Sequence, residues 1–233
     1  ERDLPPDLRP VTQIAAGNFY ALALHADGTV TRWGQLSTML LDPPVGLTNV
    51  TQIAGGGVHA LALQADGSVV AWGENEYAQI SLPQVGQDLA QVAAGRDKTV
   101  ALRRDGTVQI WGVPFLGESE IVAALRNVTQ VATGTGYSLA LHADGTVTGW
   151  DAASIQPITL PPGLTDVTQV AIGARFSLTL GDGYSLALRA DGTVVSWGAN
   201  PTGQAMPDGL NGVVQIAAGE NHALALRADG TVV

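Results

Sequence analysis

The sequence has 233 residues, of which 45% are hydrophobic and 5% aromatic, and it contains 29 glycines. Its 11 basic and 21 acidic residues give a net charge of −10, which disfavours nucleic-acid phosphates and acidic membrane headgroups as partners. Cysteine is absent, which excludes disulfides and thiolate metal sites. No run of about 18 apolar residues is present, so no membrane-spanning helix is expected.

An internal repeat organises the chain. The stretch from Ile14 to Gly34 returns five more times, and the last copy stops at Val233 before its tryptophan. Three steps between the matching tryptophans are 39 residues long (33 to 72, 72 to 111, 111 to 150) and the fourth is 47 (150 to 197). The tryptophans are Trp33, Trp72, Trp111, Trp150 and Trp197. Self-similarity at this period predicts a solenoid or a propeller.

The copies cover nearly the whole chain. They run approximately over residues 11–49, 50–88, 89–127, 128–166, 167–212 and 213–233. The opening segment 4–8 resembles segment 160–164, which leads into the fifth copy, so residues 1–10 are expected to close a ring with the sixth copy. We therefore predict one all-β domain over residues 1–233, a β-propeller of about six four-stranded blades. Seven blades are the alternative if the chain is a fragment.

Within the first copy, alternating apolar residues predict strands over residues 11–16, 20–25 and 29–33, and a weaker fourth strand before Pro43. In the second strand, Leu22 and Leu24 face one side, while the small Ala21 and Ala23 face the other. That pattern suits closely stacked sheets. No window keeps a helical period for long, so no helix is expected.

An Asp-Gly pair follows the second strand of every copy and predicts a tight hairpin turn in which both residues have positive φ. We interpret these aspartates as turn formers rather than catalytic carboxylates, and the repeated tryptophans as structural residues buried between sheets. The pairs are Asp27-Gly28, Asp66-Gly67, Asp105-Gly106, Asp144-Gly145, Asp191-Gly192 and Asp229-Gly230.

Two sets of loops vary between copies, namely those between the first and second strands and those after the third. Because chain direction alternates, both sets are expected at one rim, where partner specificity normally resides. The fifth copy also has roughly eight extra residues, which predicts that residues 175–183 project as a loop or short hairpin. The candidate partner-binding residues are Phe19, Tyr77, Phe115, Arg175, Phe176, Leu178, Leu180 and Asp182.

The last two copies carry a recognisable series of motifs. It consists of Ala218-Gly219, a strand begun by His222, Asp229-Gly230, Trp197-Gly198 and Gly203-Gln204. This series resembles the repeat of the regulator of chromosome condensation (alpha-tubulin suppressor-like) family, in the style of bacterial members such as the propeller-type β-lactamase inhibitory protein. The resemblance implies a β-propeller, usually of seven blades. Propellers of the WD type are the alternative, but only Trp150 is followed by aspartate.

No set of catalytic or metal-binding residues emerges. There is no nucleophile with a base and an orienting residue, no phosphate loop with lysine and no His-Glu metal pair, so no enzyme, cofactor or metal is expected. We predict a non-enzymatic scaffold for a protein partner that the sequence does not identify, and another copy of the same chain is one candidate. The alternatives are a self-associating cell-surface or filament protein, an inhibitor of a secreted enzyme and, least favoured, a guanine-nucleotide exchange factor.

The compartment is predicted only broadly. A bacterial chain that is secreted or held at the cell surface is favoured, and the cytoplasm stays open, because the lack of cysteine fits either. Asn49 and Asn127 begin glycosylation sequons. Since Asp166 takes the same place in its copy, we interpret this position as a turn that enters the first strand.

Overall fold

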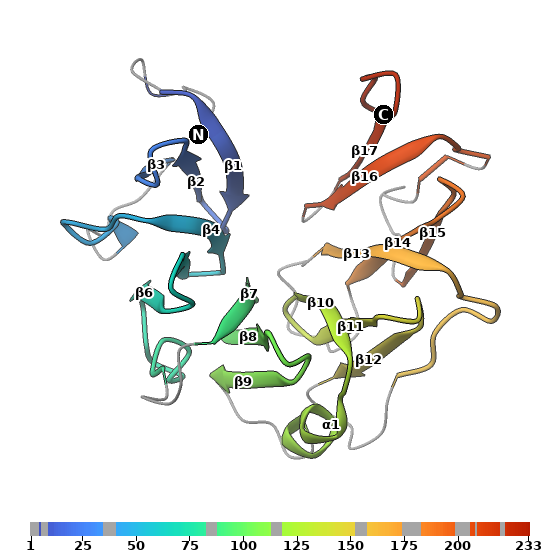
Figure 1. The fold of residues 1–233 in the computed structure, drawn as a ribbon, viewed down its shortest axis with the longest axis horizontal. Coiled ribbons are helices and arrows are strands. Elements are labelled where there is room, and N and C mark those ends of the chain that lie inside the picture. Colours follow the sequence, from blue (N-terminus) through green and yellow to red (C-terminus); the bar gives the residue numbers. More distant parts are fainter. Residues whose placement is uncertain are drawn as a thin grey trace. The chain divides into compact units, whose positions relative to one another are not determined.

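The computed structural model describes residues 5, 9–34, 41–82, 88–112, 118–151, 158–173, 183–198, 206–207, 209–219 and 222–233. These residues belong to two compact units, one made of residues 1–104 and 109–113 and the other of residues 105–108 and 114–233. Antiparallel sheets, one for each copy of the repeat, make up both units (Figure 1).

The first unit contains the sheets of the first three copies. Each has the order of its strands along the chain, so each is a meander. The strands are β1 Val11–Ala16, β2 Tyr20–His25 and β3 Val30–Gly34; β4 Val50–Gly55, β5 His59–Gln64 and β6 Val69–Gly73; and β7 Leu89–Ala94, β8 Lys98–Arg103 and β9 Val108–Gly112.

The second unit contains a short helix and the sheets of the last three copies. Two of these sheets have three strands, and the described part of the sixth has two. The elements are α1 Glu118–Ala124; β10 Val128–Thr133, β11 Tyr137–His142 and β12 Val147–Asp151; β13 Val167–Gly173, β14 Tyr184–Arg189 and β15 Val194–Gly198; and β16 Val213–Ala218 and β17 Ala223–Arg227.

The predicted all-β fold with a repeated antiparallel sheet is confirmed. In the first copy, β1 and β2 have the predicted bounds, whereas β3 both begins and ends one residue later than predicted. The reason for the later start is that the backbone N–H and the hydroxyl of Thr29 both bind Asp27 in the turn, at 3.0 and 2.6 Å. The predicted fourth strand before Pro43 falls mainly on residues 35–40, which lie outside the described residues.

The Asp-Gly turn differs from the prediction. Only Gly28 has a positive φ, of 76°, and Asp27 does not. The N–H of Gly28 donates to the carbonyl of His25 at 2.9 Å, and the N–H of His25 donates to the carbonyl of Thr29 at 2.9 Å. The loop is therefore a type I turn followed by a left-handed glycine. Its three residues are Ala26, Asp27 and Gly28.

The expectation that the chain has no helix is wrong at α1. The helix occupies the connector between the third and fourth copies, where residues 118–126 lack the prolines found in the other connectors. Ile121 and Val122 are buried, as is Leu125 just beyond the last turn. Glu118 and Glu120 lie in the first turn, where negative charge favours the helix. A single short helix of this kind gives too little periodicity to recognise in sequence.

The core lies between successive sheets of each unit. In the first unit, Leu22 and Leu24 pack against Ala60 and Ala62 of the next sheet, so the predicted stacking of a large face on a small face is confirmed.

In three copies, the turn that leads into the first strand has a left-handed residue other than glycine. Asn49 lies there before the second copy, with a φ of 57°. Asn127 and Asp166 do the same at 55° and 57°, as expected for a left-handed turn that favours asparagine and aspartate.

Candidate functional site

Each sheet has one end at which the variable loops gather. Tyr20 at the start of β2 pairs with Gly34 at the end of β3, so the loop before β2 and the segment after β3 lie at the same end. The pairings of His59 with Gly73 and of Tyr184 with Gly198 repeat this arrangement. We name this the loop end of a sheet. The Asp-Gly turns and the connectors form the opposite, turn end.

Successive sheets of the first unit have their loop ends on the same side. The carboxamide of Gln13 binds Ile53, and the hydroxyl of Tyr20 donates to the carbonyl of His59 at 2.5 Å. In the same direction, the N–H of Gly57 donates to the carbonyl of Gly95 at 3.1 Å. Equivalent residues therefore lie beside one another, which brings the variable loops of neighbouring repeats into one surface.

A small cavity opens at the loop end of the first sheet, and we name it the Phe19 socket. Its volume is about 140 Å³. Phe19 is 61% exposed, Tyr20 is buried and Trp33 is half-buried. The residues that line the socket are Gly17, Asn18, Phe19, Tyr20, Ala21, Trp33 and Gly34.

The loop after β6 displays Tyr77, which is 48% exposed. Its backbone N–H donates to the Oε1 atom of buried Gln79 at 2.9 Å. Asn75 closes the loop by accepting from the N–H of Ile80 at 3.0 Å and donating to the hydroxyl of Ser81 at 3.0 Å. Ala78 has a φ of 59°, a left-handed conformation that is costly for a residue other than glycine. The loop is thus held in one shape.

Buried polar side chains link neighbouring repeats within each unit. Nε2 of His59 lies 3.0 Å from the hydroxyl of Thr99, and that hydroxyl donates to the carbonyl of Gln79 at 2.8 Å. The hydroxyls of Tyr137 and Ser185 are 2.7 Å apart in the equivalent place. Burial raises the pKa of Tyr137 to about 12 and lowers that of His59 to about 4. These groups are therefore neutral near pH 7 and hold the sheets together.

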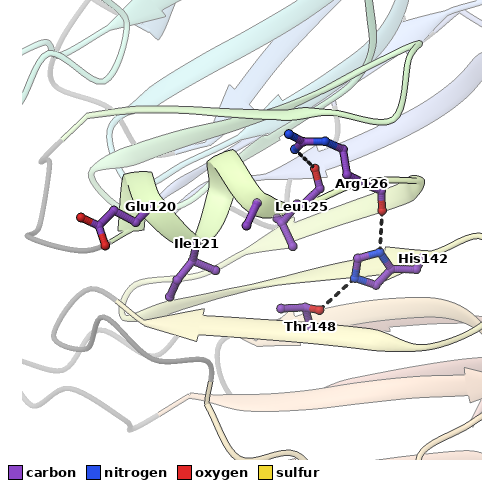
Figure 2. Close-up of a pocket in the computed structure, with 7 residues that line it drawn as sticks. Glu120, Ile121, Leu125, Arg126, His142 and Thr148 are labelled. Carbon is purple, nitrogen blue, oxygen red and sulfur yellow. Dashed lines mark hydrogen bonds between the residues drawn. The ribbon is translucent and has the colours of Figure 1, made fainter.

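A groove of about 550 Å³ lies between α1 and strands β11 and β12, at the turn end (Figure 2). Ile121 and Leu125 line its apolar part, and Glu120 is exposed at its edge. Both ring nitrogens of His142 are hydrogen-bonded, Nδ1 to the carbonyl of Arg126 and Nε2 to the hydroxyl of Thr148, each at 2.8 Å. The imidazole therefore joins the connector to the sheet by hydrogen bonds. Because neither ring nitrogen is left without a partner, the side chain is not positioned as a catalytic base.

The structure places two of the predicted partner-binding residues, Phe19 and Tyr77, in exposed positions at the loop end of the first unit. The other six, Phe115, Arg175, Phe176, Leu178, Leu180 and Asp182, lie outside the described residues. Among the tryptophans, Trp72 and Trp150 are buried, whereas Trp33, Trp111 and Trp197 are only half-buried.

The turn aspartates form hydrogen bonds within their own loops. In all six copies the carboxylate accepts from the backbone N–H and the hydroxyl of the residue two positions later. These bonds lower the pKa of Asp27, Asp66, Asp144, Asp191 and Asp229 below the usual value.

Two features were not predicted from the sequence, the groove beside α1 and a glutamine that joins neighbouring sheets. The available clue to the groove was the lack of proline in residues 118–126, and the clue to the glutamine was its presence in all six copies. Within the described part of the chain, no three or more His, Asp or Glu side chains are grouped as metal ligands. The one described helix is too short to cross a membrane.

Comparison with known proteins supports the resemblance drawn from the repeats. The family model described as the regulator of chromosome condensation (RCC1) repeat matches residues 50–79, 167–204 and 213–233. No curated protein sequence matches the chain.

Three of the solved structures with similar folds come from eukaryotic proteins. Human WBSCR16 has a TM-score of 0.75 at 21% identity, over 98% of this chain and 76% of its own. Prp20p from Saccharomyces cerevisiae has a TM-score of 0.71 at 20% identity, over 95% and 70%. Yeast RCC1 (Prp20) bound to Kap60 has a TM-score of 0.69 at 20% identity, over 95% and 69%. Three stretches of this chain therefore match the RCC1 repeat, and its all-β sheets resemble those of the RCC1 β-propeller.

Proposed function

We propose that the chain is a non-enzymatic module that binds a protein partner through the loop end of its repeats. The observation that carries this proposal is the exposure of two aromatic side chains, Phe19 and Tyr77, on loops held by neighbouring sheets. Aromatic anchors on a rigid surface supply much of the binding energy of protein interfaces. Phe115 and the insertion at residues 175–183 extend the proposed surface beyond the described residues.

The finer architecture is also part of the proposal. Six copies of the repeat support about six blades, and the segments that follow the third strands of the first, second, fourth and fifth copies are long enough for a fourth strand. Residues 1–10 then serve as the connector that precedes the first copy.

The partners named for the structural relatives are proteins, which supports this class of function. Yeast RCC1 (Prp20) was crystallised with Kap60, and Prp20p is described with binding properties to Gsp1p and histones. An identity of 20% supports the shared fold but carries over no particular partner. Nucleotide exchange is the least favoured alternative, because no residue of this chain is assigned to it.

A binding experiment tests the proposal. The immobilised chain is offered to extracts, and the bound proteins are identified and their affinities measured for wild type, the Phe19→Ala, Tyr77→Ala double variant, and a deletion of residues 175–183. We expect the altered chains to melt like wild type and to lose the partner. Val45→Ala is the control, because Val45 is fully exposed away from the loop end, at the connector after β3. Binding that is unaffected by both alterations would contradict the proposal.

Self-association is a second candidate function, and two exposed faces favour it. Ile14 on β1 is 72% exposed and Leu224 on β17 is 44% exposed. The residues equivalent to Ile14 are buried in all five other copies, beneath the preceding sheet in the second, third, fifth and sixth. Leu224 is the counterpart of Leu22 in the sixth copy. Leu22 and its counterparts in the second to fifth copies are all buried. A repeat of the same type would cover each face, and a second copy of this chain offers one.

Sedimentation velocity over a range of concentrations tests this second candidate. Self-association predicts a sedimentation coefficient that rises with concentration for wild type and stays constant for Ile14→Asp. A monomer at every concentration contradicts it. A monomer in which hydrogen exchange also protects Ile14 would instead support the closed ring predicted from the repeats.

A further inference from the structure

The Phe19 socket has the size and lining of a site for one side-chain head group. Aromatic residues border it, Phe19, Tyr20 and Trp33, and Gly17 and Asn18 add polar backbone and amide groups. Aromatic faces attract a cation within about 6 Å of the ring centre. We propose that the socket receives an arginine or lysine side chain from a basic segment of the partner. This inference rests on the protein-binding function proposed above.

The acidic character of the chain fits a basic partner. The chain has a net charge of −10, and Glu76 is exposed beside Tyr77 at the loop end of the next sheet. Two cations of the first unit are already paired, Arg32 with Asp42 at 2.8 Å and Arg96 with Asp97 at 3.2 Å. A second basic side chain of the same segment can therefore bind the carboxylate of Glu76 and the ring of Tyr77.

The socket is shaped before a partner arrives. The hydroxyl of Tyr20 donates to the carbonyl of His59 at 2.5 Å and accepts from the N–H of Gly56 at 3.1 Å, so the ring cannot turn away. A Cβ atom on Gly17 would lie 1.9 Å from this ring, which shows how closely the backbone fits it. Such preorganisation lowers the entropic cost of binding.

The experiment measures fluorescence polarisation of labelled peptides in which glycine alternates with arginine, with leucine or with glutamate. Phe19→Leu keeps an apolar side chain but removes the aromatic face, and we expect it to weaken binding of the arginine peptide about three- to tenfold. Glu76→Gln is expected to weaken the same binding about twofold or more and to reduce its dependence on salt. NMR should show the indole N–H resonance of Trp33 shifting as the arginine peptide is added.

Glu120→Gln is the matched control, because it removes the same charge from an exposed position on α1 in the other unit. Equal losses for Glu76→Gln and Glu120→Gln would show diffuse attraction to an acidic chain and would overturn the inference. So would equal binding of the leucine peptide, or no saturable binding of the arginine peptide at millimolar concentration. A protein partner that requires Phe19 and Tyr77 but is not displaced by the arginine peptide would overturn this inference alone and leave the proposed function standing.

Discussion

The carboxamide of Gln52 forms two hydrogen bonds with the backbone of Val92 in the next sheet. Its Nε2 atom donates to the carbonyl of Val92 at 3.1 Å, and its Oε1 atom accepts from the N–H at 2.9 Å. Gln13 binds Ile53 in the same way, as do Gln130 with Val170 and Gln169 with Ile216. One side chain thus makes two hydrogen bonds to the backbone of the next sheet, as a paired strand would.

Gln52→Ala should lower the free energy of unfolding by about 1–3 kcal/mol, because it leaves the N–H and carbonyl of Val92 without their partner. Urea denaturation followed by tryptophan fluorescence measures this change. Gln215→Ala is the matched control: Gln215 is exposed in the sixth copy, and its side chain has no hydrogen bond within the described part of the chain. The control should change stability by less than about 0.5 kcal/mol. Equal effects of the two substitutions would contradict the role given to the glutamine.

The sequence predicted the local part of this fold well. The two-residue alternation of Leu22 and Leu24 with alanines gave the bounds and the packing face of β2, because both depend on neighbouring residues alone. The glutamine was missed because its partner lies 40 residues away in another sheet. Its recurrence was visible, but recurrence alone does not distinguish a surface position from a contact between repeats.

The candidate site was predictable only in part. Loop variability identified Phe19 and Tyr77, and both are exposed. Trp33 also lines the Phe19 socket, although its recurrence in the repeats had led us to predict that it is buried between sheets. The exposure of a repeated residue varies with what covers each copy: Trp72 donates to the carbonyl of Leu41 at 2.9 Å and is buried, while Trp33 is half-buried.

Acid should destabilise the first unit through His59. Its pKa falls from 6.5 in the unfolded chain to about 4 in the folded one, because burial disfavours the charged imidazole. Between these values the unfolded chain binds more protons, so stability is complete above about pH 6.5 and is lost as the pH falls towards 4. The loss is about 3 kcal/mol at most. The turn aspartates have a lowered pKa, so their contribution is lost only below about 3.8, outside this window.

His59→Tyr tests the origin of that pH dependence. In the fourth copy the position equivalent to His59 is occupied by Tyr137. The hydroxyl of Tyr137 is hydrogen-bonded to Ser185, just as the ring of His59 is hydrogen-bonded to Thr99. We expect the variant to fold and to keep nearly constant stability from pH 7 to about 4.5, as measured by urea denaturation at each pH. The same slope in wild type and variant would exclude His59 as its source.

Ala78→Gly should stabilise the loop that carries Tyr77. Alanine at a φ of 59° is strained, and glycine removes that strain at the cost of a more flexible unfolded chain. We expect a net gain of about 0.5–1 kcal/mol, measured by thermal unfolding. Ala123→Gly, at an exposed position inside α1, should instead cost about 0.5–1 kcal/mol. A loss at both positions would show that the strain at Ala78 is not significant.

Gly56→Ala should be one of the more damaging single-methyl changes in the first unit. The added Cβ atom would lie 2.5 Å from the carbonyl oxygen of Gly95 and 2.5 Å from the ring of His59, and neither can withdraw, because the oxygen belongs to the backbone and the ring is buried. The expected loss is at least about 2 kcal/mol. Gly46→Ala is the comparison variant, because it measures backbone strain without crowding. Gly46 has a φ of 84°, and no atom lies within 4 Å of the Cβ atom that the substitution adds. Its cost should be about 1 kcal/mol. If Gly56→Ala proves no worse than Gly46→Ala in urea denaturation, the close approach of neighbouring repeats at this loop is not what holds them together.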